Sequence, residues 1–196
     1  GLRRLPDGRP LEIIVETAGE STEDTDMLEL IRETWREVGI KLLTKPSQRE
    51  VFRNRIFAGE TVMSIFKGLE NGIATPDMSP EELAPTSQQQ LQWPKFGQFY
   101  ESVGKSGLVP DMPEIADLLK LYEEWRAAGT NEQRAEIWQR MLQVHADQQY
   151  VIGTVNGVPQ PVVVRNSLMN VPEEGLYCWS PGAYFGVYRL DTFWFK

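Results

Sequence analysis

The first third of the chain alternates strand-length apolar runs with stretches whose apolar positions repeat at helical spacing. Residues 11–17 form a run rich in β-branched side chains, and residues 40–45 form a second. Between them, apolar side chains recur every three or four residues over residues 27–38, and Gly39 follows where a helix commonly ends. This order of strand, helix and strand predicts a βαβ unit with parallel strands.

A second helix and a third strand continue the pattern. Ser47 and Glu50 have the spacing of a capping box, which predicts a helix beginning beside Ser47, and Gly59 stands at the expected helix end. Residues 61–66 then form another strand-length apolar run. We therefore predict an α/β fold for this region, with a mostly parallel sheet flanked by helices.

Residues 67–110 interrupt this alternation with a long stretch rich in proline and glycine. Within it, Ser79, Pro80 and Glu82 predict a short helix with the serine as N-cap and the proline at the first helical position. Loops of this length in compact domains are usually functional or disordered. Four aromatic residues argue against disorder, namely Trp93, Phe96, Phe99 and Tyr100.

The second half of the chain returns to helical spacing. We predict one helix over residues 113–128 and a second that is capped by Thr130 and Gln133. Residues 150–155 and 160–164 are then expected to form strands on either side of a turn. The last 21 residues are rich in aromatic side chains and show little periodicity.

The composition is that of an ordinary globular protein. Of the 196 residues, 41% are hydrophobic and 24% are charged, which argues against wholesale disorder. The net charge of −8 argues against binding to nucleic acid or to an anionic membrane surface, because both need clustered basic residues. No apolar run approaches the length of a membrane span. The opening residues resemble a loop that enters a strand, so we expect a piece of a longer protein.

Residues typical of reaction centres are scarce. His145 is the only histidine, and we expect a helix-end or surface role for it rather than catalysis or metal binding. Cys178 is the only cysteine and is expected to be a small buried thiol. The glycines match no phosphate-binding fingerprint. We therefore predict no cofactor and no metal.

Two carboxylates lie just beyond the predicted third strand. Ligands of open α/β sheets bind outside the carboxyl ends of the strands, so Glu70 and Asp77 are candidates to face a ligand. One alternative is a hydrolase or transferase lobe that uses these two residues as an acid/base pair. Another is an interaction domain whose aromatic tail forms an exposed apolar patch.

Five segments, in this order and spacing, resemble the C-terminal lobe of the family 5 extracellular solute-binding proteins. These proteins are the dipeptide, oligopeptide and nickel receptors of ABC importers. The matching segments are residues 5–15 (LPDGRPLEIIV), 30–42 (LIRETWREVGIKL), 52–66 (FRNRIFAGETVMSIF), 130–142 (TNEQRAEIWQRML) and 150–153 (YVIG). The ordered set covers roughly residues 5–171, and it is more specific than any one of its motifs.

The resemblance implies a type II periplasmic-binding-protein-like lobe of a two-lobed receptor, which is not an enzyme. Residues 1–171 would form the C-terminal lobe, and the aromatic tail, residues 172–196, would pack on an N-terminal lobe outside this chain. The receptor would close on a small solute, with an oligopeptide as one possibility, and deliver it to ABC permease subunits. The implied location is extracytoplasmic, either periplasmic or as a lipid-anchored protein. No nucleic acid is expected as a partner.

The family pattern also indicates where the ligand would lie. In peptide-binding members, a tryptophan and then an aspartate follow the third strand, and the aspartate pairs with the α-amino group of the peptide. Here Phe66 supplies the aromatic position, but Leu69 stands at the acidic position and Glu70 follows it. Together with the carboxylates and the loop aromatics, the predicted ligand-binding residues are Phe66, Lys67, Gly68, Glu70, Asn71, Asp77 and Trp93.

Overall fold

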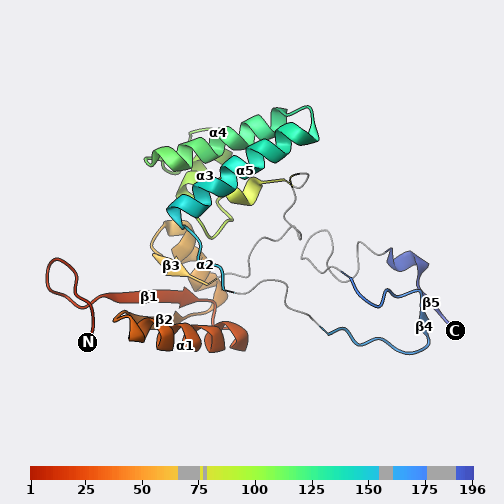
Figure 1. Ribbon diagram of the computed structural model, residues 1–196, viewed down its shortest axis with the longest axis horizontal. Helices are drawn as coiled ribbons and strands as arrows, with labels where there is room; N and C mark the ends of the chain where they lie inside the picture. The colour runs from red at the N-terminus through yellow and green to blue at the C-terminus, as the bar shows by residue number, and fades with distance from the viewer. Residues whose placement is uncertain (66–75, 77–78, 155–160, 176–188) are drawn as a thin grey trace. The chain divides into compact units, whose positions relative to one another are not determined.

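The computed structural model describes residues 1–65, 76, 79–154, 161–175 and 189–196 (Figure 1). The chain divides into two compact units, and each is described by itself. We call them the sheet unit (Gly1–Phe66 with Pro85–Asp111) and the helical unit (Lys67–Ala84 with Met112–Lys196).

A parallel sheet of three strands organises the sheet unit. Its strands are β1 (Glu12–Thr17), β2 (Lys41–Pro46) and β3 (Met63–Ser64), in the order β2-β1-β3. Both neighbours of the central strand β1 run parallel to it. This arrangement confirms the predicted α/β fold with a parallel sheet, and it places the loops that follow β1 and β2 at the same edge.

Helix α1 (Thr22–Glu37) connects β1 to β2 and lies along these strands (Figure 1). Its N-cap is Ser21, whose hydroxyl accepts a hydrogen bond from the backbone N–H of Asp24 at 3.2 Å. After the helix, Gly39 adopts a φ of 82°, a left-handed conformation that glycine takes without steric cost. The predicted glycine stop of the first helix is therefore confirmed.

The core of the sheet unit lies between α1 and one face of the sheet. Val15, Leu28 and Leu42 are almost fully buried there. Partly buried apolar side chains surround them, namely Ile13, Ile31, Trp35, Met63 and Ile65. On the opposite face, Ile14 and Leu43 stay 49% and 37% exposed. The alternating side chains of β1 and β2 therefore bury one face of the sheet more completely than the other.

Helix α2 (Arg49–Ala58) follows β2, but it does not begin with the predicted capping box. Its N-cap is Gln48, and no side chain of the described residues forms a cap hydrogen bond there. Ser47 instead donates its backbone N–H to the carbonyl oxygen of Thr17 at 3.1 Å. Because this bond extends the ladder between β1 and β2, Ser47 is held in an extended segment and does not cap the helix.

The next two elements also differ from the sequence predictions. Strand β3 spans two residues, whereas residues 61–66 were expected, and Phe66 lies outside the described residues. The loop after it contains an unpredicted helix, α3 (Pro94–Glu101), which begins with a proline in its first turn. Trp93 precedes it at a φ of 53°. Gly97, in the middle of α3, is buried against the backbone of Ser87.

The helical unit begins with a short 3-10 turn. This turn, η1 (Glu81–Leu83), follows Pro80 as its N-cap, so the short helix starts one residue later than predicted. The backbone N–H of Leu83 closes the turn by donating to the carbonyl of Pro80 at 2.9 Å. The Nε2 atom of His145 lies 2.8 Å from the carbonyl oxygen of Leu83. This contact agrees with the helix-end role expected for the histidine.

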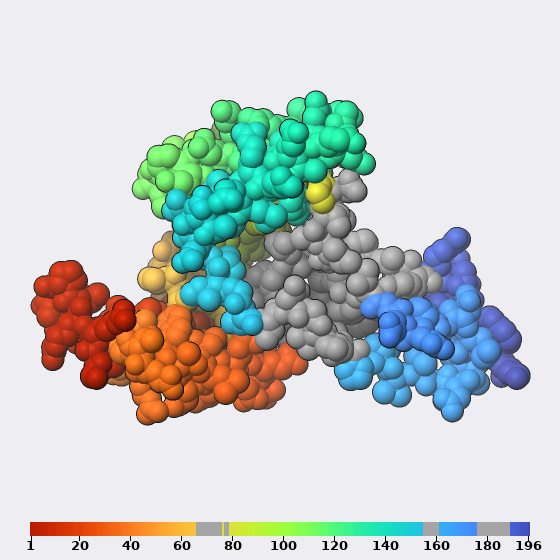
Figure 2. Space-filling view, viewed as in Figure 1, coloured from red at the N-terminus to blue at the C-terminus, as the bar shows by residue number. Residues whose placement is uncertain are grey.

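Helices α4 (Pro113–Ala127) and α5 (Asn131–Gln148) form an antiparallel pair joined by a short turn (Figure 1). Thr130 caps α5 as predicted, because its hydroxyl accepts from the N–H of Gln133 at 3.2 Å. The space-filling view shows the two helices packed along each other (Figure 2). The buried side chains of the pair are Ile115, Leu118, Leu121, Ile137, Trp138 and Met141.

The prediction of two strands after α5 is wrong for the residues that the structure describes. Residues 150–154 and 161–164 adopt no strand conformation. Val151 and Val163 are 65% and 96% exposed, so their β-branched side chains have no face to bury. Farther along, β4 (Leu168–Met169) pairs with β5 (Trp194–Phe195), after the 3-10 turn η3 (Leu190–Thr192).

Candidate functional site

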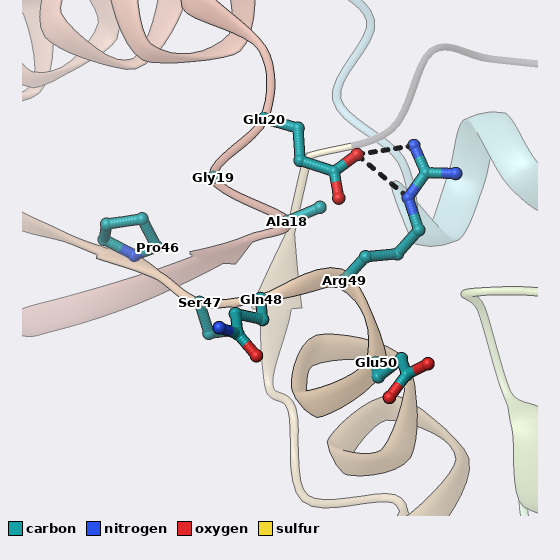
Figure 3. Close-up of a pocket in the computed structure, with 8 residues that line it drawn as sticks. All are labelled: Ala18, Gly19, Glu20, Pro46, Ser47, Gln48, Arg49 and Glu50. Atoms are coloured by element: carbon teal, nitrogen blue, oxygen red, sulfur yellow. Dashed lines mark hydrogen bonds and ion pairs between the residues drawn. The ribbon is translucent and has the colours of Figure 1, made fainter.

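A cavity of about 660 Å³ opens at the carboxyl edge of the sheet. Two loops line it: Ala18, Gly19 and Glu20 follow β1, and Pro46, Ser47, Gln48, Arg49 and Glu50 lead from β2 into α2 (Figure 3). Open α/β sheets bind their ligands outside the carboxyl ends of the strands. The cavity is therefore a candidate binding site, and it is formed by the loops that follow two neighbouring strands of the sheet.

The loop after β1 turns tightly and approaches the loop after β2 closely at Gly19. The hydroxyl of the buried Thr17 accepts a hydrogen bond from the N–H of Gly19 at 3.1 Å, which tightens the turn after β1. Gly19 has a φ of 67°, and a Cβ added there would lie 3.2 Å from the carbonyl oxygen of Ser47. The glycine therefore provides both the left-handed turn and the close approach of the loops.

One ion pair crosses the space between the loops. Arg49 places its Nη2 2.7 Å and its Nε 3.0 Å from the same carboxylate oxygen of Glu20. Figure 3 shows these two side chains pointing toward each other, while Glu50 points away from them. Both partners are more than half exposed. Ion pairs with such exposure are screened by water and contribute little to stability.

Ser47 contributes a polar atom with unused bonding capacity. Its hydroxyl oxygen is shielded from solvent, and no described residue forms a hydrogen bond with it. A shielded polar atom without a partner costs free energy, so such atoms commonly occur where a ligand or water completes the site. The position of Ser47 in the cavity lining is consistent with a binding role for this edge.

A buried carboxylate of the central strand fixes α2 to the sheet. Glu16 of β1 is 5% exposed, and its two oxygens accept hydrogen bonds from Nε and Nη2 of Arg55 at 2.7 and 2.9 Å. Lys45 lies 3.6 Å from the same carboxylate, and Arg55 also pairs with Glu60 at 2.7 Å. The hydrogen bonds and charge of Arg55 lower the pKa of Glu16 below its ordinary value of 4.5.

The ligand-binding residues predicted from the sequence lie mostly outside the described residues. Trp93 is described, and it is partly buried in the sheet unit just before α3. It does not line the cavity at the carboxyl edge. The other six predicted residues lie outside the described residues: Phe66, Lys67, Gly68, Glu70, Asn71 and Asp77. These residues, including the acid/base pair of the enzyme alternative, stay predictions.

The described residues contain no candidate metal centre. Among them, no group of three or more histidine, cysteine, aspartate or glutamate side chains is placed to hold a metal ion. Cys178 lies outside the described residues. In the described part of the chain, every helix is too short or too polar to cross a bilayer.

Known structures share this fold. The oligopeptide-binding protein OppA is 22% identical, with a TM-score of 0.56 over 74% of this chain and 24% of its own. The fold is that of a periplasmic-binding-protein lobe. NikA from Brucella suis, solved with Fe(III)-EDTA, gives 18% identity and a TM-score of 0.52 over 76% of this chain and 26% of its own.

A third solved structure of this lobe fold is the periplasmic binding protein MelB from Agrobacterium fabrum, in complex with stachyose. It is 15% identical, with a TM-score of 0.55 over 74% of this chain and 20% of its own. The chain thus spans about a quarter or less of the length of these solved structures. No family model matches the sequence, and no curated protein matches it.

The loops that form the cavity were not among the predicted ligand-binding residues. The ligand was predicted to lie beyond the third strand, although the same edge rule applies to every parallel strand of a sheet. The polar segment after residue 17 and the polar residues before α2 both follow predicted strands. Applying the rule to the first two strands would therefore have indicated Glu20 and Arg49 as well.

Proposed function

We propose that this chain is a lobe of the substrate-binding component of an ABC import system, and that it is not an enzyme. The observation that carries this proposal is the cavity at the carboxyl edge of a sheet whose fold matches periplasmic binding proteins. The cavity is open, and its polar groups come from two loops rather than from a closed pocket. An open half-site of this kind suits a ligand that is held from two sides.

In the proposed mechanism, a second lobe outside this chain closes over the solute. The free energy of closure comes from contacts that exist only in the closed state, so the solute shifts the equilibrium toward that state. The segment that contains Phe66 to Asn71 would provide further contacts on the same edge. The closed receptor would then deliver its cargo to permease subunits from an extracytoplasmic location, either periplasmic or lipid-anchored.

The C-terminal segment supports a contact with this second lobe. We propose that residues 1–171 form the C-terminal lobe and that residues 172–196 pack on the missing N-terminal lobe. Trp194 and Phe195 are 54% and 68% exposed, and Leu190 is 50% exposed. Exposed apolar side chains in sequence proximity are typical of surfaces that are covered by another part of a protein.

The proposal extends to the class of solute. The similar structures are an oligopeptide-binding protein, a protein in complex with Fe(III)-EDTA and a protein in complex with stachyose. A small polar solute, with an oligopeptide as the first candidate, fits a cavity lined by carboxylate, guanidinium and amide groups. Trp93 does not line this cavity, so an aromatic contact from Trp93 stays a prediction from the sequence.

Calorimetric titration tests the proposed function. The two-lobed protein that contains this chain is titrated with tripeptides, Fe(III)-EDTA and stachyose, and the 196-residue chain is titrated in parallel. We expect one class to bind the two-lobed protein, and the lone chain to bind it roughly 100-fold more weakly because half of the contacts are missing. Equal affinity for the lone chain would contradict the shared cleft, and the absence of binding by all three classes would contradict these candidates.

A further inference from the structure

In the cavity, the guanidinium of Arg49 already binds a carboxylate, that of Glu20. Nε and Nη2, the two donors on one side of the Arg49 guanidinium, both contact Glu20. Both donors converge here on one oxygen, Oε2, and the same guanidinium edge has the two parallel donors by which arginine recognises carboxylates in proteins and ligands. Within the described residues, Arg49 forms no other ion pair. Arg49 therefore pairs with one carboxylate, which belongs to the loop on the other side of the cavity.

The contrast with Arg55, another arginine of α2, indicates that the contact is replaceable. Arg55 holds Glu16, whose side chain is 6% exposed and belongs to the central strand. Glu20, by comparison, is 52% exposed and follows a glycine in a loop. Moving Glu16 would break a buried ion pair, whereas the pair formed by Glu20 is exposed to solvent. An exposed ion pair is also weak in water, so another carboxylate competes with it readily.

We infer that Glu20 occupies the place of a solute carboxylate, and that a carboxylate-bearing solute displaces it to bind Arg49. This inference rests on the proposed solute-binding role of the same cavity. Arg49 is then the residue that determines specificity for an anionic group, and Glu20 is an internal competitor that occupies Arg49 while the site is empty. Exchange of one carboxylate for another leaves the charge of the arginine compensated in both states.

The inference predicts opposite effects for the two partners. Glu20→Gln removes the competitor and is expected to bind a carboxylate solute about threefold more tightly, which is the range by which exposed ion pairs act. Arg49→Gln removes the receptor group and is expected to weaken binding at least about tenfold. Arg49→Lys keeps the charge but loses the two parallel donors, so an intermediate loss is expected.

Nuclear magnetic resonance of the 196-residue chain measures this exchange. The Nε–H signal of Arg49 and the amide signals of Gly19 and Gln48 are followed while sodium propionate is added at constant ionic strength. Propionamide, which has the same shape without the charge, and sodium chloride serve as matched probes. Glu33→Gln is the control variant, because Glu33 pairs with Arg36 on the exposed surface of α1 away from the cavity.

We expect propionate to shift these signals in a saturable manner, Glu20→Gln to tighten the binding, and Glu33→Gln to leave it unchanged. Equal shifts with chloride or propionamide would overturn the inference, and so would unchanged affinity in Glu20→Gln or Arg49→Gln. If stachyose or a tripeptide amide shifts the cavity amides while propionate does not, the inference fails and solute binding at this edge stands. The calorimetric titration of the two-lobed protein decides the proposed function separately.

Discussion

Replacing Gly97 with alanine is expected to lower the free energy of unfolding by about 3 kcal/mol. A Cβ at this position would lie 2.2 Å from the carbonyl oxygen of Ser87 and 2.3 Å from its carbonyl carbon. Both atoms belong to backbone, so they cannot rotate away, and the segment that carries Ser87 must shift relative to α3. Alanine is a better helix former than glycine, which means that any loss arises from this contact. Chemical denaturation monitored by tryptophan fluorescence measures the change.

Gly153→Ala provides the matched control for this prediction. A Cβ at Gly153 meets no atom within 4 Å, and its backbone does not adopt a positive φ. We expect this variant to unfold within about 0.5 kcal/mol of the parent chain, as surface substitutions usually do. Equal stability of the two alanine variants would show that α3 does not pack on residues 87–88 as described.

Glu16→Gln is expected to lower the free energy of unfolding at pH 7 by about 2 kcal/mol. The substitution keeps the shape of the side chain but removes the charge that compensates Arg55 beneath α2. Glu12→Gln is the control, because Glu12 lies on the same strand and face and pairs with Lys41 at a more exposed site. We expect the control to lose much less stability. Denaturation of both variants at pH 7 provides the comparison.

The same pair has a defined pH dependence. Arg55 lowers the pKa of Glu16 in the folded chain, so the unfolded chain binds the proton more readily. The stabilisation is therefore fully present above the ordinary pKa of 4.5 and is lost as the pH falls through the lowered value. The stability difference between the parent and Glu16→Gln should shrink progressively below pH 4.5. A difference that stays constant in this range would contradict a charged Glu16 in the folded state.

The sheet unit was predictable where local and long-range signals agree. The runs at residues 11–17 and 40–45 match β1 and β2, because their β-branched residues bury one face against the apolar stripe of α1. Gly39 marks the end of α1 in sequence and in structure. Thr130 and Gln133 likewise mark the start of α5.

The wrong predictions arose where tertiary contacts override local patterns. Ser47 and Glu50 have capping-box spacing, yet the ladder to Thr17 holds Ser47 in an extended conformation. The valines of residues 160–164 have high strand propensity, but strand formation requires a partner and a buried face. Helix α3 was missed because proline and glycine in its surroundings resemble a loop, although Pro94 is a helix-start signal.

The candidate site was predictable in kind but not in position. The sequence indicated a binding edge beyond parallel strands, and the structure places a cavity there. The pairing of Glu20 with Arg49 depends on the register between β1 and β2, which brings two loops 29 residues apart in sequence into contact. Composition contains no information on this register, and periodicity indicates only which side chains of each strand face the core.

Hydrogen exchange of the two-lobed protein with and without its solute tests the central claim, that the carboxyl edge of the sheet is one wall of a closing cleft. We expect slower exchange on solute binding in residues 18–20 and 46–50, with the amides on the exposed face of α5 unchanged. Protection confined to the helical unit, with unchanged exchange at the loops after β1 and β2, would contradict it.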